Sequence, residues 1–284
     1  MPNLEQPIQH SELKNSIDSE QRFGGTQRVY GADGTAILNN AHVCIVGIGG
    51  VGAWVSEAFA RTALGQLTLI DLDDICVTHT NRQIHALTNT IGVAKVDAMA
   101  ERIKHINPQC QVNIIEDFVT PENVSELIQK KFDYVEDATD SIKAKAAMIA
   151  YCKRNKIPII TIGGAGGQID PTKIAVTDLS KTIQDPLAAK LRSELRRFYN
   201  FPVNPKRRFA IDCVYSTEQL RYPQTDGLVC MQKTLNDGSV KLDCNNGFGA
   251  AVVVTATFGF VATARVIEKL IDKSVNKPHN NKQN

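Results

Sequence analysis

The amino-acid sequence predicts an α/β fold with a doubly wound, mostly parallel sheet and an irregular, mixed C-terminal half. Three observations lead to this expectation. Short apolar segments rich in β-branched residues alternate with helical patterns between residues 42 and 161. A G-x-G-x-x-G turn joins the first apolar segment to the first helix, and an aspartate ends the second segment. After Gly167 the regular alternation is lost.

Five strands are expected, each short, apolar and bounded by Gly, Pro or charged residues. In chain order they are His42–Val46, Gln66–Ile70, Gln111–Ile115, Phe132–Asp137 and Pro158–Thr161. The helices between them are Gly52–Thr62, Ala94–Asn107, Pro121–Lys130 and Ser141–Asn155. The third helix is expected to start with Thr120 as its N-cap and Pro121 at its first position, where the N–H that proline lacks is not needed.

The composition is that of an ordinary folded chain of 284 residues, 43% hydrophobic and 22% charged, which excludes collagen-like and largely disordered classes. The length permits one large domain or two small ones. We expect a single domain over residues 21–272, with halves at about 41–167 and 168–272. The polar residues 1–20 are expected to form a tail or a surface helix, and residues 273–284 a second tail.

Cysteine usage and the start of the chain indicate the cellular compartment. The seven cysteines are scattered, and no basic segment followed by an apolar one opens the sequence, so we expect a cytoplasmic protein. Residues 247–264 form an uncharged segment that reaches the length of a membrane-spanning helix. Its many Ala, Val, Thr and Gly residues favour a buried core helix, with membrane association through 247–264 as the alternative.

The glycine turn predicts a Rossmann-like nucleotide site. Its glycines are Gly47, Gly49, Gly50 and Gly52, and they bring backbone amides at a helix N-terminus close to phosphates. Asp71 ends the second strand and Asp73 follows two positions later. At this place an acidic side chain accepts hydrogen bonds from ribose hydroxyls.

The residues that follow favour ATP over a nicotinamide cofactor. Asn81 and Arg82 come shortly after the second strand, and Lys95 opens the next helix. Cations that converge on phosphates stabilise the charge of a departing pyrophosphate. Hydride transfer from a nicotinamide has no need of such cations. Asp140 follows the fourth strand, where a carboxylate suits Mg²⁺. Taken singly, Arg82 and Lys95 are more often solvated surface charges.

A basic stretch between Lys181 and Arg208 predicts an RNA-binding surface, because it holds eight basic residues against two acidic ones. Phe198, Tyr199 and Phe201 are interleaved with the charges and suit base stacking. The plainer alternative is a solvated helix whose aromatic residues face the core, and an acidic carrier protein would use the same surface. The candidate RNA-binding residues are Arg192, Arg196, Arg197, Lys206, Arg207 and Arg208.

These motifs resemble the adenylating superfamily of the ThiF, MoeB and HesA proteins, which includes the ubiquitin-activating enzymes. The matching motifs are GIGGVG at 47–52, LIDLDD at 69–74, NRQ at 81–83, Lys95 and DATD at 137–140. Within the superfamily the chain is most similar to the dehydratases that cyclise threonylcarbamoyladenosine in tRNA. That likeness rests on RFGG at 22–25, NRQIHA at 81–86, GGAGGQIDP at 163–171, KTIQDPLAAK at 181–190 and FGA at 248–250.

The resemblance implies ATP-dependent cyclisation next to the anticodon through adenylation of a carboxylate, with Mg²⁺ at Asp140. It also implies a homodimer and leaves room for a cysteine-desulfurase or sulfur-acceptor partner. The alternative is a sulfur-relay enzyme that adenylates the C-terminus of a carrier protein. Implied catalytic residues are Arg82, Lys95 and Asp140. The implied cofactor-binding residues are Gly47, Gly49, Gly50, Gly52, Asp71, Asp73, Asn81, Arg82, Lys95 and Asp140.

The chain departs from the superfamily pattern in two ways. Carrier-activating relatives have an arginine that reaches the partner subunit's nucleotide, and here Gly25 stands at that position, with Arg22 and Arg28 as substitutes. Those relatives also hold zinc with two Cys-x-x-Cys pairs, a spacing absent from this sequence, so no zinc is expected. Inert thiols are expected throughout. The candidates for reactivity are Cys213, Cys230 and Cys244.

Overall fold

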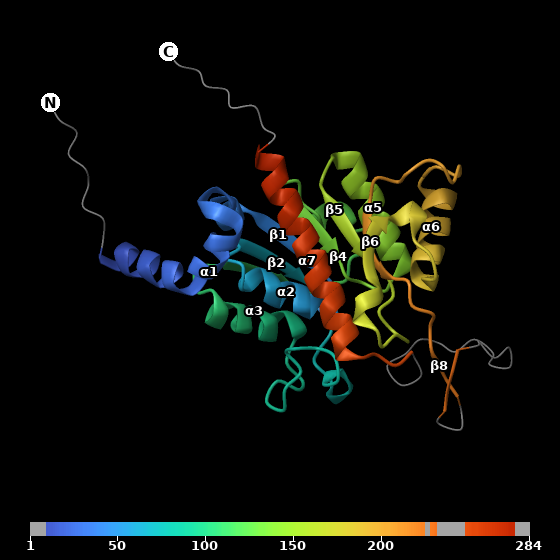
Figure 1. Ribbon diagram of the computed structural model, residues 1–284, viewed down its shortest axis with the longest axis horizontal. Helices are drawn as coiled ribbons and strands as arrows, with labels where there is room; N and C mark the ends of the chain where they lie inside the picture. Colours follow the sequence, from blue (N-terminus) through green and yellow to red (C-terminus); the bar gives the residue numbers. More distant parts are fainter. Residues whose placement is uncertain (1–9, 225–227, 232–247, 276–284) are drawn as a thin grey trace, which may run out of the picture.

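The computed structural model describes residues 10–224, 228–231 and 248–275. Its centre is a seven-stranded sheet with the order β3-β2-β1-β4-β5-β7-β6 (Figure 1). The strands are β1 (His42–Val46), β2 (Gln66–Ile70), β3 (Gln111–Ile115), β4 (Tyr134–Asp137), β5 (Ile159–Ile162), β6 (Ile174–Asp178) and β7 (Asp212–Ser216). All neighbours pair in parallel except β6, which is antiparallel to β7. The predicted doubly wound, mostly parallel sheet is confirmed.

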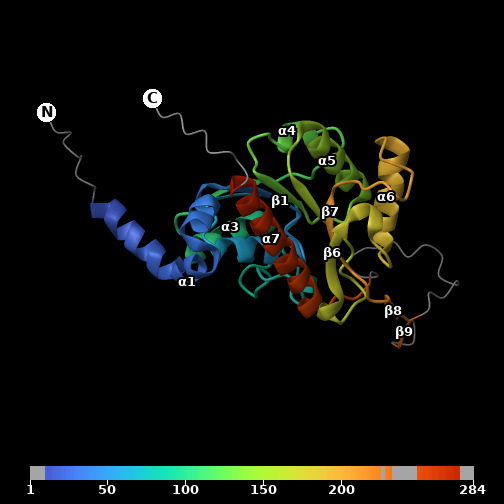
Figure 2. The same cartoon turned by 45° about the horizontal axis from the view of Figure 1, so that its top comes forward.

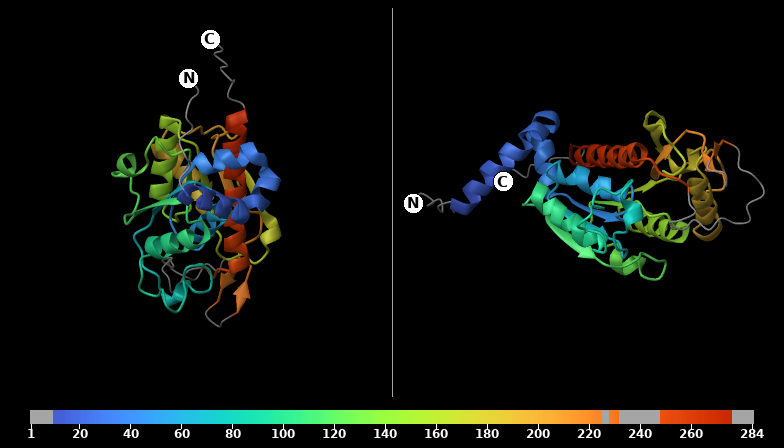
Figure 3. Two further views of the ribbon diagram at one scale, coloured as in Figure 1. Left: turned by 90° about the vertical axis from the view of Figure 1, so that its left-hand side faces the viewer. Right: turned by 90° about the horizontal axis from the view of Figure 1, so that it is seen from below.

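Helices cover both faces of this sheet. In chain order they are α1 (His10–Asn40), α2 (Gly52–Ala60), α3 (Lys95–Ile106), α4 (Val124–Leu127), α5 (Ile142–Asn155), α6 (Pro186–Phe198) and α7 (Val252–Val275). One face carries α2, α3 and α7, and the other carries α4, α5 and α6 (Figure 3). Because β1 is covered on both faces, all five of its residues are buried, which explains its unbroken apolar sequence.

The second half of the chain joins the sheet of the first half. β7 pairs with β5, with Ile160 opposite Asp212. Short 3₁₀ turns flank β6 at Pro171–Lys173 and Leu179–Lys181, and a third lies at Val77–His79. A small antiparallel pair, β8 (Tyr222–Pro223) and β9 (Val229–Cys230), stands apart from the main sheet. This part of the fold is the irregular, mixed half that the sequence predicts.

Of the apolar segment at 247–264, residues 252–264 form the start of a core helix, and Gly247 lies outside the described residues. α7 buries Val254, Phe258 and Ala262 in the core between the sheet and α2. A Cβ on Gly259 would lie only 3.0 Å from Cβ of Trp54, so the absence of a side chain lets α7 approach α2 closely. None of the helices within the described residues combines the length and apolar character needed to cross a membrane.

The N-terminal region is helical where the sequence predicts a tail or a surface helix. α1 begins at His10 and is broken at Gly31, whose φ of 76° lies in the left-handed region. The part before Gly31 projects away from the sheet (Figure 2), and the part after it buries Leu38. The sequence patterns did not predict this helix between residues 21 and 40. At the other end, α7 continues to Val275, into the expected tail.

The predicted helix at Pro121–Lys130 is wrong in extent, because α4 covers only Val124–Leu127. The hydroxyl of Thr120 accepts hydrogen bonds from the amides of Glu122 and Asn123. In return, the amide of Thr120 donates to Oδ1 of Asn123 at 2.7 Å. These bonds close a turn around Pro121 instead of capping a long helix.

Candidate functional site

The loop after β1 is a tight glycine turn that leads directly into α2. Gly47 has a φ of 88°, in the left-handed region that glycine adopts at no steric cost. A Cβ on Gly52 would lie 1.8 Å from the carbonyl oxygen of Gly47, so no larger residue fits there. The turn therefore brings backbone amides to the N-terminus of α2, where the helix dipole favours an anion.

Asp71 fastens the glycine turn to the loop after β2. Its Oδ2 accepts a hydrogen bond from the Ile48 amide at 2.6 Å, and its Oδ1 accepts one from the Asp73 amide at 2.9 Å. Only 7% of the residue is exposed. Each carboxylate oxygen has a second lone pair, so these bonds leave capacity for the predicted ribose contact.

Lys95 is brought to the same loop by both its backbone and its side chain. Its amide donates to the carbonyl oxygen of Asp73 at 3.0 Å. Its Nζ lies 2.6 Å from Oδ2 of Asp73 and 3.8 Å from Oδ1 of Asp71. Three of the residues that the sequence predicts as site residues therefore form one charged cluster at the carboxyl end of β2.

Arg82 lies across the glycine turn. A Cβ on Gly50 would lie 3.2 Å from Cγ and Cδ of Arg82. The Arg82 carbonyl accepts a hydrogen bond from Nε1 of Trp54 at 2.9 Å, and its guanidinium donates to Oδ1 of Asn81 at 2.9 Å. Asn81 in turn donates to the carbonyl oxygen of Ala250 at 3.2 Å. The segment just before α7 thus borders the site, which sequence spacing alone did not predict.

Two polar residues just after Arg82 were not singled out from the sequence. Nε2 of His85 lies 2.9 Å from the carbonyl oxygen of Ile48, and burial lowers the pKa of His85, so a neutral ring donates from Nε2. Among the described residues, Nδ1 of His85 and Oε1 of Gln83 are buried without a hydrogen-bond partner. The NRQIH sequence was the signal, since it places two more polar side chains beside the turn.

The DATD segment after β4 lies against the glycine turn. A Cβ on Gly47 would lie 3.0 Å from the carbonyl group of Ala138, and the Ala138 amide donates to the Val46 carbonyl at 2.9 Å. Asp140 is exposed at the end of this segment, whereas Asp137 is fully buried. The structure therefore brings Asp140 to the same edge of the sheet as the glycine turn, as the sequence predicts.

Lys145 is a buried residue of this edge that sequence reasoning missed. Its side chain is 0% exposed, and its Nζ lies 3.1 Å from Oδ2 of Asp137. It also donates to Oγ1 of Thr161 at 3.2 Å and to the Ile162 carbonyl at 2.8 Å. No pattern marks it, because a lysine on a helix is ordinarily a surface residue.

The basic stretch lies toward the opposite edge of the sheet. Asp185, which caps α6, accepts a hydrogen bond from the Gly164 amide just beyond β5. α6 begins there and runs for 13 residues, a length of about 20 Å. Its last turn holds Arg196 and Arg197, at the end of the helix away from the Asp185 cap.

Some of the predicted RNA-binding side chains are exposed, and others are half-buried and hydrogen-bonded within the fold. Arg197, Lys206, Arg207 and Arg208 are exposed. Arg192 is half-buried and donates to Oγ1 of Thr182, so part of its hydrogen-bonding capacity is used within the fold. Arg196 donates to the Pro202 carbonyl at 3.3 Å and lies over the Phe209 ring.

The aromatic residues of this stretch divide in the same way. Phe201 is 6% exposed and packs edge-to-face on Phe209, so the prediction of base stacking on Phe201 is wrong. Tyr199 is half-buried. Phe198 is 58% exposed beneath the guanidinium of Arg197, which leaves it as the aromatic platform of this surface.

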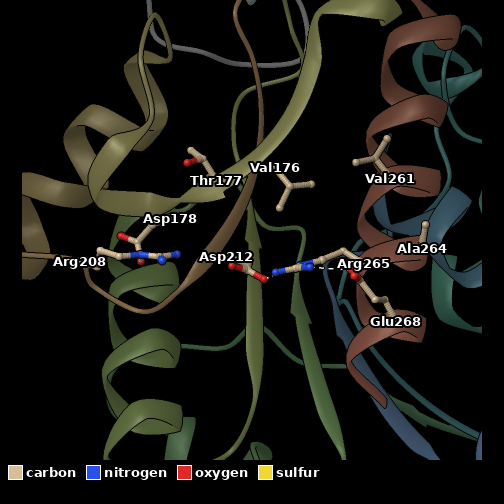
Figure 4. A pocket seen from close by; sticks show the side chains of 9 residues that line it. All are labelled: Val176, Thr177, Asp178, Arg208, Asp212, Val261, Ala264, Arg265 and Glu268. Carbon is tan, nitrogen blue, oxygen red and sulfur yellow. Dashed lines mark hydrogen bonds and ion pairs between the residues drawn. The ribbon is translucent and has the colours of Figure 1, made fainter. Parts of the chain in front are cut away.

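A pocket of about 570 Å³ opens between β6, β7 and α7 (Figure 4). Figure 4 shows Arg265 reaching between Asp212 and Glu268, at 2.7 Å and 2.6 Å. Asp178 and Asp212 face each other across the β6–β7 pair at the amino end of β7. The pocket is therefore separate from the glycine turn. Of its two arginines, Arg265 is neutralised by two carboxylates, and Nε of Arg208 lies 3.5 Å from Oδ2 of Asp178.

The cysteines differ from expectation in two respects. Cys213 is buried in β7, where burial raises the pKa of its thiol, so its place among the reactive candidates is wrong. Cys230 is half-buried, and Cys244 lies outside the described residues. Cys76, which the sequence did not single out, is exposed beside the site, and a hydrogen bond from Thr78 lowers the pKa of its thiol.

Two N-terminal arginines stand near the position where relatives carry a trans arginine. Arg22 pairs with Asp18 at 2.7 Å on α1. The guanidinium of Arg28 lies beside Gly24 and Gly25, 3.6 Å and 3.9 Å from where their Cβ atoms would be. Both belong to the part of α1 that projects from the sheet.

Comparison with known proteins identifies relatives over nearly the whole chain. The chain is 58% identical over 254 residues to tRNA threonylcarbamoyladenosine dehydratase of Escherichia coli K12, covering 89% of this chain and 95% of that one. The Haemophilus influenzae protein of the same name is 59% identical over 255 residues, with the same coverage. A crystal structure of the E. coli enzyme in complex with ATP superposes with a TM-score of 0.81 and 53% identity, covering 91% of this chain and 97% of that chain.

The residues of the site lie within the part of the chain that a known family model matches. The glycine turn, the Asp71–Asp73–Lys95 cluster and Arg82 gather at the carboxyl edge of a doubly wound sheet. The sequence pattern of the ThiF family matches residues 25–284, and this range contains every one of these residues. The chain belongs to the ThiF family.

Proposed function

We propose that this protein is an ATP-dependent dehydratase that closes a ring in threonylcarbamoyladenosine of tRNA, next to the anticodon. The observation that carries the proposal is the 58% identity across 95% of the E. coli enzyme of that name. Similarity of this extent includes the whole site described above. A related E. coli structure, 53% identical, was solved in complex with ATP, which supports ATP as the nucleotide.

ATP is assigned to the carboxyl edge of β1, β2 and β4. The amides of the glycine turn hold its phosphates, and Asp71 accepts hydrogen bonds from the ribose. Arg82 lies over Gly50 and Lys95 is held 2.6 Å from Asp73. Both cations are thus fixed before the reaction begins and stabilise the charge that builds on the pyrophosphate. Asn81 anchors this arrangement to the segment before α7.

The donor set at this edge fits a magnesium ion that arrives with ATP. Asp140 offers an exposed carboxylate beside the glycine turn, and within the described residues no three His, Cys, Asp or Glu side chains gather into a metal site. Mg²⁺ commonly uses one or two carboxylates together with substrate phosphates and water. When bound, Mg²⁺ neutralises phosphate charge, and Asp140 is the residue that would hold it.

The reaction proceeds in two steps. A carboxylate oxygen of the threonyl group attacks the α-phosphorus of ATP, and the bond to pyrophosphate breaks. The neighbouring carbamoyl group then attacks the activated carbonyl, loses a proton and expels AMP, which carries away the carboxylate oxygen. The net change in the nucleoside is loss of one water. Because the second nucleophile is already beside the carbonyl, proximity accelerates ring closure without a protein nucleophile.

The tRNA is assigned to the exposed basic residues at the end of α6 and in the following loop. Arg197, Lys206 and Arg207 neutralise its backbone, and the exposed ring of Phe198 accepts an unpaired base. A tRNA is long enough to reach from this surface to the opposite edge of the sheet, where ATP is assigned.

A homodimer is part of the proposal. Support comes from the projecting first part of α1 (Figure 2) and from Val253 and Phe260 of α7, which are 53% and 45% exposed. Exposed apolar side chains on one helix face are typical of an interface. In the dimer, Arg28 takes the place of the superfamily's trans arginine, because Arg22 is engaged by Asp18.

Release of pyrophosphate from purified protein tests the proposal. Threonylcarbamoyladenosine-modified tRNA is expected to stimulate the release, whereas unmodified tRNA is not. Stimulation by a small carrier protein, in place of tRNA, would instead establish the alternative of a carrier-activating, sulfur-relay enzyme. A cysteine desulfurase or sulfur acceptor would then be its partner.

A further inference from the structure

The buried lysine behind the DATD segment is not used by any step of the reaction above. Lys145 lies near the start of α5, and its amide donates to the carbonyl oxygen of Ser141, which caps that helix. Its Nζ reaches Asp137 at the end of β4 and the Thr161 hydroxyl and Ile162 carbonyl at the end of β5. One side chain thus joins two strand ends to one helix.

Stability alone is a poor explanation for this ion pair. Both Lys145 and Asp137 are 0% exposed, so each charge was moved out of water at a cost that their attraction offsets only in good geometry. An apolar pair of similar volume is often at least as stable. The pair instead fixes the orientation of the Asp137 carboxylate. This carboxylate accepts hydrogen bonds from four donors: Lys145, the Thr161 hydroxyl, and the amide and hydroxyl of Thr139.

The segment held in this way is the one that carries Asp140. Between Asp137 and Asp140, the backbone of Ala138 lies against Gly47, where a Cβ would meet its carbonyl group at 3.0 Å. The Cβ of Ala138 similarly lies 3.2 Å from where a Cβ on Gly52 would be. The segment is therefore clamped between the glycine turn on one side and the Lys145 network on the other.

We propose that Lys145 is a positioning residue, which through Asp137 holds the Asp137–Asp140 segment against the glycine turn in the geometry that the reaction of ATP requires. The inference rests on the proposed function and adds a residue to it. Lys145 contacts neither nucleotide nor tRNA in this scheme. It acts on the placement of Asp140, and a displacement of about 1 Å in a reacting group is enough to cost about 10²-fold in rate.

The double variant Lys145→Met/Asp137→Asn tests the inference, because it removes both buried charges and leaves neither unpaired. We expect it to fold and to lower kcat for tRNA-stimulated pyrophosphate release by about tenfold or more, with KM for ATP changed by less than about threefold. A purely structural role would lower the amount of folded protein and leave kcat per folded molecule unchanged. A folded double variant with the wild-type kcat would overturn the inference.

Two further variants give the comparison its controls. Thr161→Val keeps the ion pair and removes one donor to Asp137. We therefore expect kcat to decrease, but by less than in the double variant. Arg102→Met/Glu57→Gln removes another ion pair, in which Nε of the half-buried Arg102 lies 2.6 Å from Oε2 of the buried Glu57 between α3 and α2. That control is expected to lower the melting temperature and leave kcat unchanged.

A binding measurement separates this inference from the proposed function. Mg-ATP is expected to raise the melting temperature of the wild type and of the Arg102→Met/Glu57→Gln control, because a ligand stabilises the state that binds it. The Lys145→Met/Asp137→Asn variant is expected to keep most of that shift, because its KM for ATP changes by less than about threefold while kcat falls. Absence of tRNA stimulation in the wild type would reject the proposed function alone. A double variant that loses the Mg-ATP shift, so that weaker binding alone explains its lower rate, would reject the positioning role of Lys145.

Discussion

Nζ of Lys95 lies 2.6 Å from Oδ2 of Asp73, so the first residue of α3 is tied to the loop after β2. The lysine is 4% exposed, and its backbone amide donates to the carbonyl of the same aspartate. A flexible side chain is thereby fixed in advance, which reduces the entropy lost when it contacts a phosphate.

Lys95→Ala is expected to lower kcat for pyrophosphate release by about 10²-fold, the loss typical of one preorganised charge contact to a transition state. Affinity for ATP should fall less. Steady-state kinetics of the purified variant measure both. Lys104→Ala, an exposed lysine on the same helix, is the matched control and should behave as wild type. Near-normal kcat for Lys95→Ala would remove this lysine from the mechanism.

Arg82→Ala should reduce kcat by a similar factor of about 10², because the arginine lies over Gly50 of the phosphate-binding turn. The hydrogen bond from the Trp54 indole to the Arg82 carbonyl does not involve the Arg82 side chain, so the variant should fold. Arg61→Ala, at the far end of α2 with 59% of its side chain exposed, serves as the control. Equal rates for the two variants would contradict the role of Arg82.

The sequence predicted the nucleotide half well because local pattern and tertiary environment agree there. β1, β2 and β3 have the predicted limits, since each is a short apolar run between polar loops. The sequence predicted a helix at Pro121, but a turn forms there. Hydrogen bonds between Thr120 and Asn123 compete with helix formation. Lys145 and the Ala250 contact were missed because both depend on segments that only the fold brings together.

The basic surface should contribute to tRNA binding through exposed charges only. Replacing Arg197, Lys206 and Arg207 by Ser is expected to weaken tRNA binding and to flatten the slope of log affinity against log salt by about one for each lost phosphate contact. ATP binding should not change. The control replaces three exposed lysines elsewhere, Lys104, Lys130 and Lys131. An unchanged slope in the test variant would place the RNA surface elsewhere.

Glu136 makes stability depend on pH. It lies on β4 between Ile45 and Ile160 of the neighbouring strands, and within the described residues both of its carboxylate oxygens lack a hydrogen-bond partner. Burial raises the pKa of Glu136 well above its ordinary value of 4.5. The folded state therefore holds a proton that the unfolded state releases, so stability falls as pH rises above 4.5 toward the folded pKa.

Glu136→Leu is expected to raise the free energy of unfolding at pH 8 by about 1–3 kcal/mol, the cost of a buried unsatisfied polar group. The gain should be smaller at pH 5. Glu136→Gln keeps a polar side chain but does not titrate, so its stability should lack this pH dependence. Urea unfolding of the three proteins at several pH values measures the effect. A wild type as pH-independent as the Gln variant would show that the buried carboxyl has a partner.

Cysteine chemistry should be dispensable, because ring closure uses the substrate's own carbamoyl group. Cys76→Ser, beside the site, and Cys213→Ser, in β7, are both expected to retain most of the pyrophosphate-releasing activity, and Cys230→Ser and Cys244→Ser likewise. Cys213→Ser should lose some thermal stability, since it buries a hydroxyl. A folded variant that binds ATP and tRNA but is inactive would favour the sulfur-relay alternative.

The central claim is that the protein removes water from a modified nucleoside at the expense of ATP. Mass spectrometry of nucleosides from modified tRNA, incubated with the purified protein and Mg-ATP, tests it most directly. We predict that threonylcarbamoyladenosine is replaced by a product lighter by one water, with one AMP and one pyrophosphate formed for each ring, and that Arg82→Ala slows all three together. An unchanged nucleoside after complete reaction of the ATP would contradict the proposed function.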